Sequence, residues 1–203
     1  NTEIIPAEGC TEPIAIAYAA AKATQILGKK PERMHISCSG NIIKNVKSVI
    51  VPNSGGLIGI GVSAAMGAFA GNPDKELMVI SNTTPEQLIE VRAFLDKKSI
   101  HIQHANVSDK LYIKVKLFAG NESASVELKQ RHTNITEIIK DDQIIFQAPH
   151  EEKSTQEDPA SILTIQLIYD LAKCIDIALI KNLLDKVILL NSAIATEGLI
   201  HDY

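Results

Sequence analysis

The most constraining feature of the sequence is an alanine-rich segment, Ile14–Leu27, that is apolar on nearly every side of the helix it predicts. A helix without a polar face is stable only when it is buried, so this segment belongs in a core. The residues Thr11-Glu12-Pro13 suit a helix start, since they supply an N-cap, an acidic side chain and a first-turn proline. Gly28 and Pro31 end the helix. The sequence therefore predicts a buried helix over residues 11–27.

Further helices are predicted at residues 57–71 and 84–98. The helix at 84–98 is amphipathic, with apolar residues at the helical period. The helix at 57–71 carries small residues at every fourth position, and this stripe is a face that another backbone can approach closely. The stripe consists of Gly59, Ser63, Gly67 and Gly71.

Short apolar or β-branched segments predict strands at residues 34–39 and 46–51. Further along, apolar and polar residues alternate, most clearly in Leu111–Phe118, as expected of a sheet with one solvated face. Hairpin turns are predicted at Gly120-Asn121 and Asp141-Asp142. The remaining predicted strands are 100–104, 123–130, 134–140 and 143–147. The predicted fold class is α+β, with flanking buried helices and a mainly antiparallel sheet lobe.

A domain boundary is predicted near residue 150. Residues 1–150 form the α+β region, and the polar, acidic segment His150–Asp158 is typical of a linker. Residues 160–195 are almost wholly helical in pattern, with a break near Asp176. We therefore interpret residues 151–203 as an acidic linker followed by the start of a helical half.

Composition limits the classes of partner. The chain of 203 residues has a net charge of −4, which disfavours sequence-independent nucleic-acid binding. The longest uninterrupted apolar helix, 57–71, is shorter than the ~20 residues that a bilayer span needs. Three widely spaced cysteines do not suggest a disulfide framework and favour a reducing compartment. We therefore expect a cytoplasmic protein with neither a nucleic-acid nor a membrane partner.

Two motifs are weak. Gly59–Ala64 matches a dinucleotide-binding pattern, but seven residues separate it from the preceding predicted strand and no acidic residue follows at the expected distance. Helix packing explains these glycines better. His101 and His104 are three apart in a predicted strand and so point to opposite faces, which makes a poor metal pair.

Cys10 is the strongest candidate for chemistry. It lies immediately before a predicted helix start, where the positive helix end and free N–H groups favour a thiolate. That environment suits a nucleophile or a metal ligand, whereas the alternative is an inert buried thiol. Cys38 lies in an apolar predicted strand and Cys174 in an apolar predicted helix, so both are expected to be core residues.

Several short segments, taken together and in order, resemble a known family. They are Gly9-Cys10-Thr11-Glu12-Pro13, Ser39–Asn45, Val51–Gly56 leading into the small-residue helix, His132-Thr133-Asn134-Ile135, and Ala195–Leu199. Each segment alone is weak, but the ordered set resembles the first half of the bacterial and archaeal L-cysteine desulfidase family, which is related to the alpha chain of the iron–sulfur L-serine dehydratases.

The resemblance implies α,β-elimination on a small amino acid. L-Cysteine would give hydrogen sulfide, ammonia and pyruvate, and L-serine would lose water. It also implies a [4Fe–4S] cluster in the full-length enzyme, with Cys10 as one ligand and two further cysteines in a second half that this chain lacks. We therefore expect a truncated, inactive chain without a cluster, whose uncovered apolar surface promotes self-association.

The resemblance also suggests residue roles. His132 is a candidate proton carrier, because its ordinary pKa lies near neutrality. Alternatively, His132 would only stabilise a turn. Asn41 and Asn45 would likewise be turn residues, and Glu12 would only stabilise the end of a helix. The predicted catalytic residues are His132, Asn41 and Asn45, and the predicted substrate-binding residues are Ser39, Ser54, Gly55 and Gly56.

Two other classes of function stay open. Residues 100–147 would suit a regulatory module that binds an amino acid without chemistry. Alternatively, the stripe from Gly59 to Gly71 would lie at a subunit interface of an assembly domain.

Overall fold

We describe the fold from a computed structural model of the chain, covering residues 4–149 and 163–201. The chain divides into two compact units, and residues 4–149 form the larger one, here called the α+β unit. The second, called the helical unit, is described over residues 163–201. The predicted linker at 150–158 lies outside the described residues.

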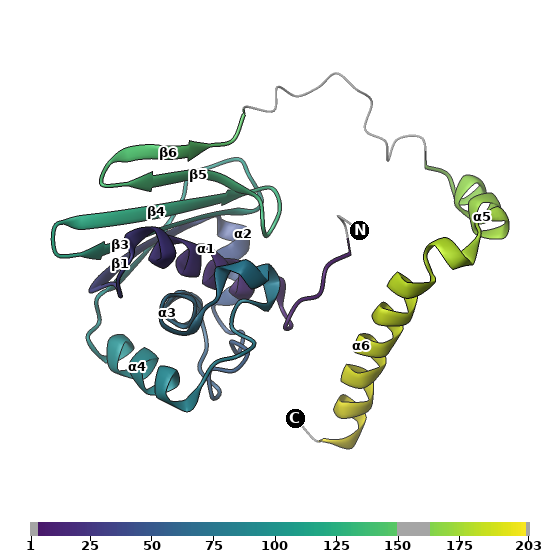
Figure 1. The fold of residues 1–203 in the computed structure, drawn as a ribbon, viewed down its shortest axis with the longest axis horizontal. Helices are drawn as coiled ribbons and strands as arrows, with labels where there is room; N and C mark the ends of the chain where they lie inside the picture. Colours follow the sequence, from purple (N-terminus) through teal and green to yellow (C-terminus); the bar gives the residue numbers. More distant parts are fainter. Residues whose placement is uncertain (1–3, 150–162, 202–203) are drawn as a thin grey trace. The chain divides into compact units, whose positions relative to one another are not determined.

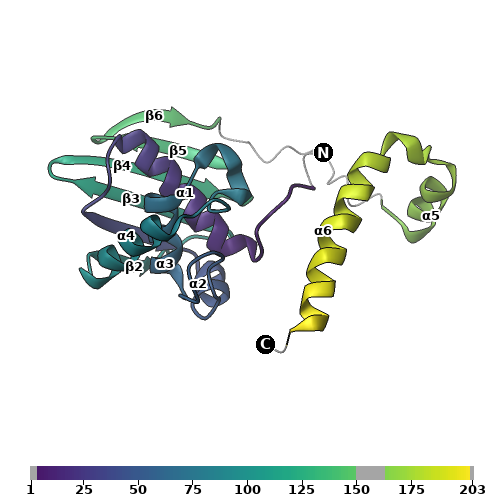
Figure 2. The ribbon, with the colours of Figure 1, turned by 60° about the horizontal axis from the view of Figure 1, so that its bottom comes forward.

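The α+β unit contains a six-stranded sheet in the order β2-β1-β3-β4-β5-β6 (Figure 1; β2 is labelled in Figure 2). β1 and β2 are parallel, and every other neighbouring pair is antiparallel. The predicted α+β class with a mainly antiparallel sheet is therefore confirmed. The strands are β1 (Arg33–Cys38), β2 (Ile100–His104), β3 (Tyr112–Ala119), β4 (Glu122–Lys129), β5 (Ile135–Lys140) and β6 (Gln143–Gln147).

Helices cover one face of this sheet in layers (Figures 1 and 2). α1 (Thr11–Leu27) packs on β3 and β4, α3 (Ile60–Ala70) packs on α1, and α4 (Pro85–Asp96) packs on α3. Because α1 lies between the sheet and α3, its residues from Pro13 to Ala21 are all buried. This position explains why the sequence of α1 has no polar face. The unit also contains α2 (Gly40–Val46) and the 3-10 segment η1 (Pro73–Met78).

The small-residue stripe is used for packing inside the chain. A Cβ atom at Gly67 would lie 2.0 Å from the carbonyl oxygen of Ala17, and one at Gly71 would lie 2.7 Å from the Cβ atom of Ala21. The backbone of α3 therefore approaches α1 at its alanine-rich face, as the stripe predicts. The assembly reading is wrong for Gly67 and Gly71, because α1 of the same chain covers them.

The predicted strand at 46–51 is wrong. Val46 is the last residue of α2, and the only β pairing nearby is an isolated bridge between Ile50 and Ile58. Ile42 and Val46 are four apart and both buried, so residues 40–46 follow the helical period, whereas residues 47–51 after them form neither a helix nor a strand. The predicted helix at 57–71 also begins later, at Ile60, because Gly59 has a left-handed φ of 97°.

The second face of the sheet is polar but well packed. Its centre is Glu127 on β4, which is 8% exposed. The Oη of Tyr112, at 3.0 Å, and the Oγ1 of Thr136, at 2.8 Å, donate hydrogen bonds to this carboxylate, and the Nζ of Lys129 lies 2.7 Å away. Burial raises the pKa of Glu127, but these hydrogen bonds outweigh it and hold the pKa below its usual range.

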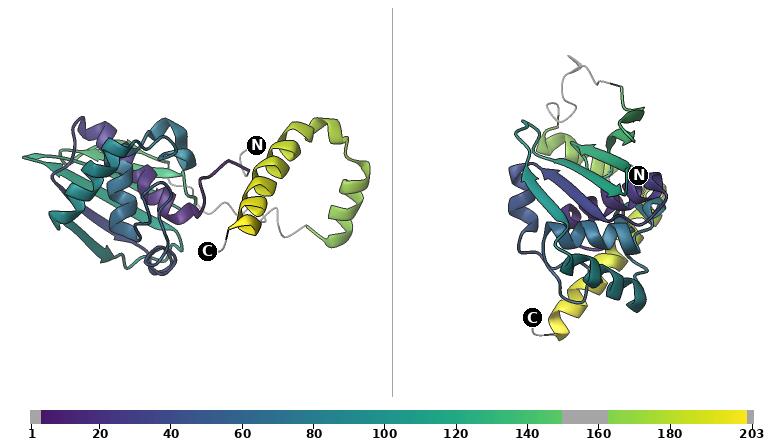
Figure 3. Two further views of the ribbon diagram at one scale, coloured as in Figure 1. Left: turned by 90° about the horizontal axis from the view of Figure 1, so that it is seen from below. Right: turned by 90° about the vertical axis from the view of Figure 1, so that its left-hand side faces the viewer.

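The helical unit contains α5 (Ile165–Cys174), the 3-10 segment η3 (Ile177–Leu179) and α6 (Lys181–Ile200). Asp176 accepts a hydrogen bond from the N–H of Ala178, which confirms the predicted break there. Cys174 is exposed, so its predicted place in a core is wrong; Cys38 is buried as predicted. No helix in the described residues is long and apolar enough to cross a membrane. Large apolar side chains are exposed on α5, η3 and α6, among them Leu171, Leu179, Ile188 and Leu189. Figure 3 shows the ribbon of α6, the longest helix of the unit, in yellow.

Candidate functional site

The candidate site lies at the start of α1. Cys10 occupies the N-cap position and is exposed. Its Sγ donates a hydrogen bond to the Oε2 of Glu12 at 3.2 Å, and the Oγ1 of Thr11 donates to the same oxygen at 3.3 Å. The thiol and the hydroxyl are therefore gathered on one carboxylate within the first turn.

The other oxygen of Glu12 reaches a second element. The Nδ2 of Asn45, in the last turn of α2, donates to the Oε1 of Glu12 at 3.0 Å. α2 lies beside the start of α1 in Figure 2. His132, in the turn between β4 and β5, is near enough to interact electrostatically with Glu12. One carboxylate thus accepts hydrogen bonds from Cys10 and Asn45 and interacts electrostatically with His132, although the three residues are far apart in the sequence.

The ionisation of this cluster differs from the expectation for a cysteine at a helix start. Partial burial and the neighbouring Glu12 raise the pKa of Cys10, so the thiol is favoured and the predicted preference for thiolate is wrong. For Glu12, burial opposes ionisation, but hydrogen bonds from Cys10, its own backbone and Asn45 lower its pKa. Burial lowers the pKa of His132, which Glu12 partly offsets. At neutral pH the site therefore holds a thiol, a carboxylate and an imidazole biased towards its neutral form.

The predicted substrate-binding serines are committed to the backbone. Ser39 is buried, and its Oγ donates to the carbonyl of Lys110 at 2.8 Å. Ser54 is fully buried, and its Oγ accepts from the N–H of Leu57 at 3.0 Å while donating to the carbonyl of the same residue. Both hydroxyls therefore stabilise local structure. Asn41, by contrast, is exposed one turn before Asn45 on α2.

The loop around Gly55 and Gly56 lies next to the segment that carries Cys10. The Nδ2 of Asn53 donates to the Oε2 of Glu8 at 3.1 Å, which ties the loop to that segment. Gly55 and Gly56 are exposed with left-handed φ values of 70° and 86°. Because α3 begins at Ile60, Gly55 and Gly56 lie in the loop before this helix, and their N–H groups are not part of its N-terminus.

Sequence reasoning gave Glu12 only a supporting role, yet it is the residue on which the site converges. The available signal was an acidic residue in the first helical turn, two positions after the candidate cysteine. Nothing in the local sequence indicates that Asn45 and His132 fold back onto it, since their proximity comes from the packing of α2 and the β4–β5 turn.

The accessible thiols do not by themselves fit an iron–sulfur cluster. A [4Fe–4S] cluster is held by several thiolates, whereas Cys10 is the exposed cysteine of the α+β unit. Burial raises the pKa of Cys38 to about 12, so it is a core thiol. Among the described residues, no group of three or more His, Cys, Asp or Glu side chains is arranged to hold a metal ion. We therefore derive no step through a cluster.

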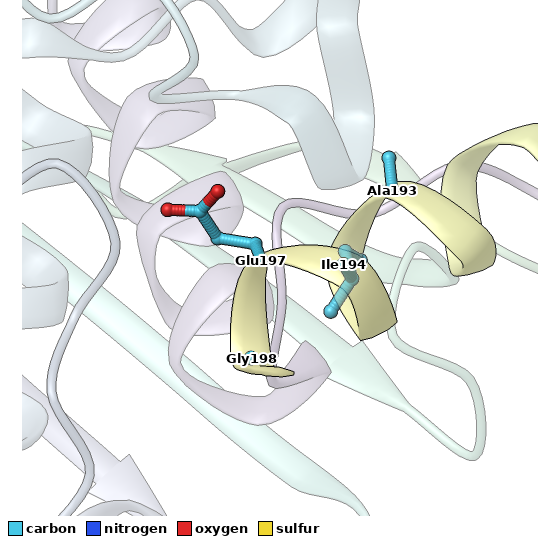
Figure 4. A pocket seen from close by; sticks show the side chains of 4 residues that line it. All are labelled: Ala193, Ile194, Glu197 and Gly198. Atoms are coloured by element: carbon cyan, nitrogen blue, oxygen red, sulfur yellow. The ribbon is translucent and has the colours of Figure 1, made fainter. Parts of the chain in front are cut away.

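A surface hollow on α6 is not a competing site. Figure 4 shows that Ala193, Ile194, Glu197 and Gly198 line it, and all four come from one helix. The carboxylate of Glu197 is 3.0 Å from the Nε2 of His201, one turn further along. A hollow on a single exposed helix does not enclose a ligand.

The chain is similar to proteins named UPF0597. It is 52% identical over 201 residues to one from Fusobacterium nucleatum. The matched region covers 97% of this chain and 47% of that protein. Relatives from Lachnoclostridium phytofermentans and Finegoldia magna are 39% and 37% identical over 203 and 200 residues, covering 49% and 48% of their lengths. The chain thus spans about half the length of these curated relatives. Neither a protein-family signature nor a solved structure matches it.

Proposed function

We propose that the α+β unit contributes substrate-handling residues to a cytoplasmic lyase that performs α,β-elimination on L-cysteine or L-serine. The single observation that carries the proposal is the convergence of Cys10, Asn45 and His132 on the carboxylate of Glu12. These residues come from three separate segments, each of which resembles the same lyase family. An active site commonly collects polar residues from distant segments in this way.

The proposed elimination needs a base and a group that holds the substrate. The base removes the Cα proton. The electron pair of the broken Cα–H bond then forms the Cα–Cβ double bond as the Cβ–S or Cβ–O bond breaks. The leaving group takes up a proton, and the resulting aminoacrylate tautomerises to an imine that water hydrolyses to pyruvate and ammonia. His132 suits the role of proton acceptor, because its lowered pKa favours the neutral imidazole.

Glu12 and Asn45 would position the substrate and balance the charge of its ammonium group. Glu12 can attract the ammonium group of an amino acid, since its lowered pKa keeps it ionised at neutral pH. Its hydrogen bond with Asn45 fixes that carboxylate between α1 and α2. In this proposal, Cys10 could serve as a ligand of a [4Fe–4S] cluster only together with thiolates from outside the described residues.

Replacing His132 with glutamine tests the proposal. The measurement is pyruvate release from L-cysteine and L-serine, under anaerobic conditions, by a chimera in which this chain replaces the matching region of the Fusobacterium nucleatum relative. Because a general acid–base residue typically contributes a factor of ~10²–10⁴, we expect kcat to fall by about 100-fold or more.

A control variant distinguishes the loss of proton transfer by His132 from a change in the conformation of the turn. The Nδ2 of Asn134 donates to the carbonyl of Lys129 at 3.0 Å and so holds the same turn. Asn134→Ala should therefore leave most of the activity intact. Equal losses in both variants would make His132 a turn residue, and a chimera that binds amino acids without releasing pyruvate would favour the regulatory-module alternative.

A second prediction concerns the 203-residue chain by itself. Anaerobic reconstitution with iron and sulfide should leave it colourless, because the α+β unit offers one exposed thiol where a cluster needs several. The measurement is absorbance near ~400 nm together with bound iron. A stable brown protein that releases pyruvate from cysteine would contradict this prediction and the assignment of Cys38 as a core thiol.

A further inference from the structure

Basic side chains gather on the second face of the sheet, where β2, β1 and β3 run side by side. Met34 of β1 is buried in the core, so Arg33 and His35, which flank it along the strand, lie on the second face. His101 of β2 and Lys116 of β3 lie beside His35 in the sheet register. Three neighbouring strands thus bring together four basic residues, here called the basic cluster: Arg33, His35, His101 and Lys116.

The basic cluster is packed around the ring of Phe118. The ring centroids of His35 and His101 are 5.4 Å apart, and the ring of His35 is 5.0 Å from that of Phe118. The Cζ of Arg33 lies 4.0 Å from the centroid of the same ring, and the Nζ of Lys116 lies 5.4 Å from it. The Nη1 of Arg33 is also 3.5 Å from the Nε2 of His35. These contacts hold the cationic groups close together, while Arg33 and His101 stay exposed to a ligand.

The rest of this face has balanced charges. The Nζ of Lys114 is 2.5 Å from the Oε1 of Glu137, and the Nζ of Lys129 is 2.7 Å from the Oε1 of Glu127. Each of these lysines therefore has a carboxylate beside it on the sheet. The basic cluster, one or two strands away, differs from this arrangement.

Carboxylates scarcely balance the charge of the basic cluster. Lys116 pairs with Asp142 at 3.2 Å, but the side chain of Asp142 is 87% exposed, so water screens this pair. Among the described residues, no carboxylate forms an ion pair with Arg33, His35 or His101. Burial lowers the pKa of His35, and its basic neighbours in the cluster lower it further. An anion bound among these groups would relieve their mutual repulsion.

We propose that the basic cluster binds a tetrahedral oxyanion, either free phosphate or the phosphate group of a small metabolite. A guanidinium group presents paired N–H donors to such an anion, and imidazolium and ammonium groups add single donors. Donors from three strands match the several oxygens of a phosphate better than the two of a carboxylate. The proposal does not depend on lyase activity, because α1, α2 and the β4–β5 turn form the site around Glu12.

A metal ion is the other ligand that a pair of histidines could bind. Neutral imidazoles are common ligands of transition metals. However, the charges of Arg33 and Lys116 repel a cation, and the guanidinium of Arg33 lies close to the Nε2 of His35. The described residues also place no group of three or more His, Cys, Asp or Glu side chains where it could hold a metal ion. The surroundings of this histidine pair therefore favour an anion.

Nuclear magnetic resonance of the histidine rings in the intact chain tests the proposal. Sodium sulfate is the probe, because it stays doubly charged over the range, pH ~5.5 to ~8, in which imidazole titrates. Sodium chloride keeps the ionic strength constant. Sulfate should shift the ring resonances of His35 and His101 and leave those of His104 unchanged. His104 is the internal control, because it lies three residues after His101 on β2 and so on the opposite face.

The affinity for sulfate should rise as the pH falls. Protonation gives His35 a positive charge that attracts the anion, so bound sulfate should in turn raise the pKa of His35. We expect sulfate to bind at least about five-fold more tightly at pH ~5.5 than at pH ~8. His35→Gln should remove most of this pH dependence.

Substitutions identify the groups that hold the anion. Arg33→Gln and His101→Gln should each weaken sulfate binding at least about five-fold at pH ~5.5, because each removes a charged donor. His104→Gln is the matched control and should bind sulfate like the wild type. Circular dichroism establishes that all the variants are folded.

The outcomes are distinct. Sulfate that leaves the resonances of His35 and His101 unchanged, or that shifts those of His104 as strongly, would overturn the proposal. Unchanged binding by Arg33→Gln would also overturn it. Zinc chloride that shifts the two cluster histidines when sulfate does not would make them a metal site, again against the proposal.

A comparison of two phosphates distinguishes the sources of the anion. Tighter binding of glycerol 3-phosphate than of inorganic phosphate would support the proposal with a phosphorylated metabolite as the ligand. Inorganic phosphate that binds as tightly or more tightly would support it with free phosphate as the ligand. If neither phosphate shifts the resonances of His35 and His101, the proposal is wrong.

Discussion

Replacing Gly67 with alanine is expected to lower the free energy of unfolding of the α+β unit by about 3 kcal/mol. The added methyl group would lie 2.0 Å from the carbonyl oxygen of Ala17 and 2.6 Å from its Cα atom. Both are backbone atoms of α1, so no side-chain rotation can relieve the overlap. The two helices would have to move apart, which loosens the packing of α1 between α3 and the sheet.

Gly61→Ala is the matched control, because Gly61 lies in the same helix. Its added methyl group would meet the Cδ1 of Ile100 at 3.5 Å, an ordinary van der Waals contact. An alanine in a helix also loses less backbone entropy on folding than a glycine, so this variant should be as stable as the wild type or up to ~1 kcal/mol more stable. Urea denaturation followed by circular dichroism measures both changes.

The outcome distinguishes packing within the chain from packing between subunits. If Gly67→Ala leaves stability unchanged but alters sedimentation, α3 would contact another subunit and the α1–α3 contact described above would be incorrect. A large loss of stability at Gly67 with none at Gly61 would support it.

Most elements of the α+β unit follow from local patterns in the sequence. α1 is predictable because its capping residues and its all-round apolar pattern agree, and β3–β6 are predictable because their alternation and turns agree. α2 was missed because its seven residues, Gly40–Val46, give too short a pattern to show the helical period, which becomes visible in the burial of Ile42 and Val46. Cys174 was wrongly assigned to a core because the apolar sequence of its helix suggested burial, whereas the described residues leave Cys174 exposed.

The candidate site was predictable only in part. Cys10, Asn45 and His132 were named from the sequence, and the structure gathers them around Glu12. Ser39 and Ser54 were also named, but each hydroxyl bonds a backbone group that only the folded chain brings near it. The pKa of Cys10 could not be inferred either, because the helix end favours the thiolate whereas the adjacent carboxylate opposes it, and the orientation of Glu12 decides between them.

The second large effect is expected from Glu127→Gln, which should lower the free energy of unfolding by about 2–3 kcal/mol at neutral pH. The change removes the charge that Lys129 and the hydroxyls of Tyr112 and Thr136 surround, at a position that is 8% exposed. Glu122→Gln is the control on the same strand. Its partner Lys29 is 2.6 Å away, but both side chains are nearly half exposed, so the loss should stay within ~1 kcal/mol.

The effect of Glu127 should depend on pH in a direction fixed by its lowered pKa. A carboxyl whose pKa is lower in the folded chain than in the unfolded chain contributes its full stability above the unfolded value, ~4.3 for glutamate, and loses it as pH falls through the folded value. The difference in stability between wild type and Glu127→Gln should therefore be constant near neutral pH and shrink below about pH 4. A difference that instead grows on acidification would mean that burial, which raises the pKa, dominates over the hydrogen bonds from Lys129, Thr136 and Tyr112.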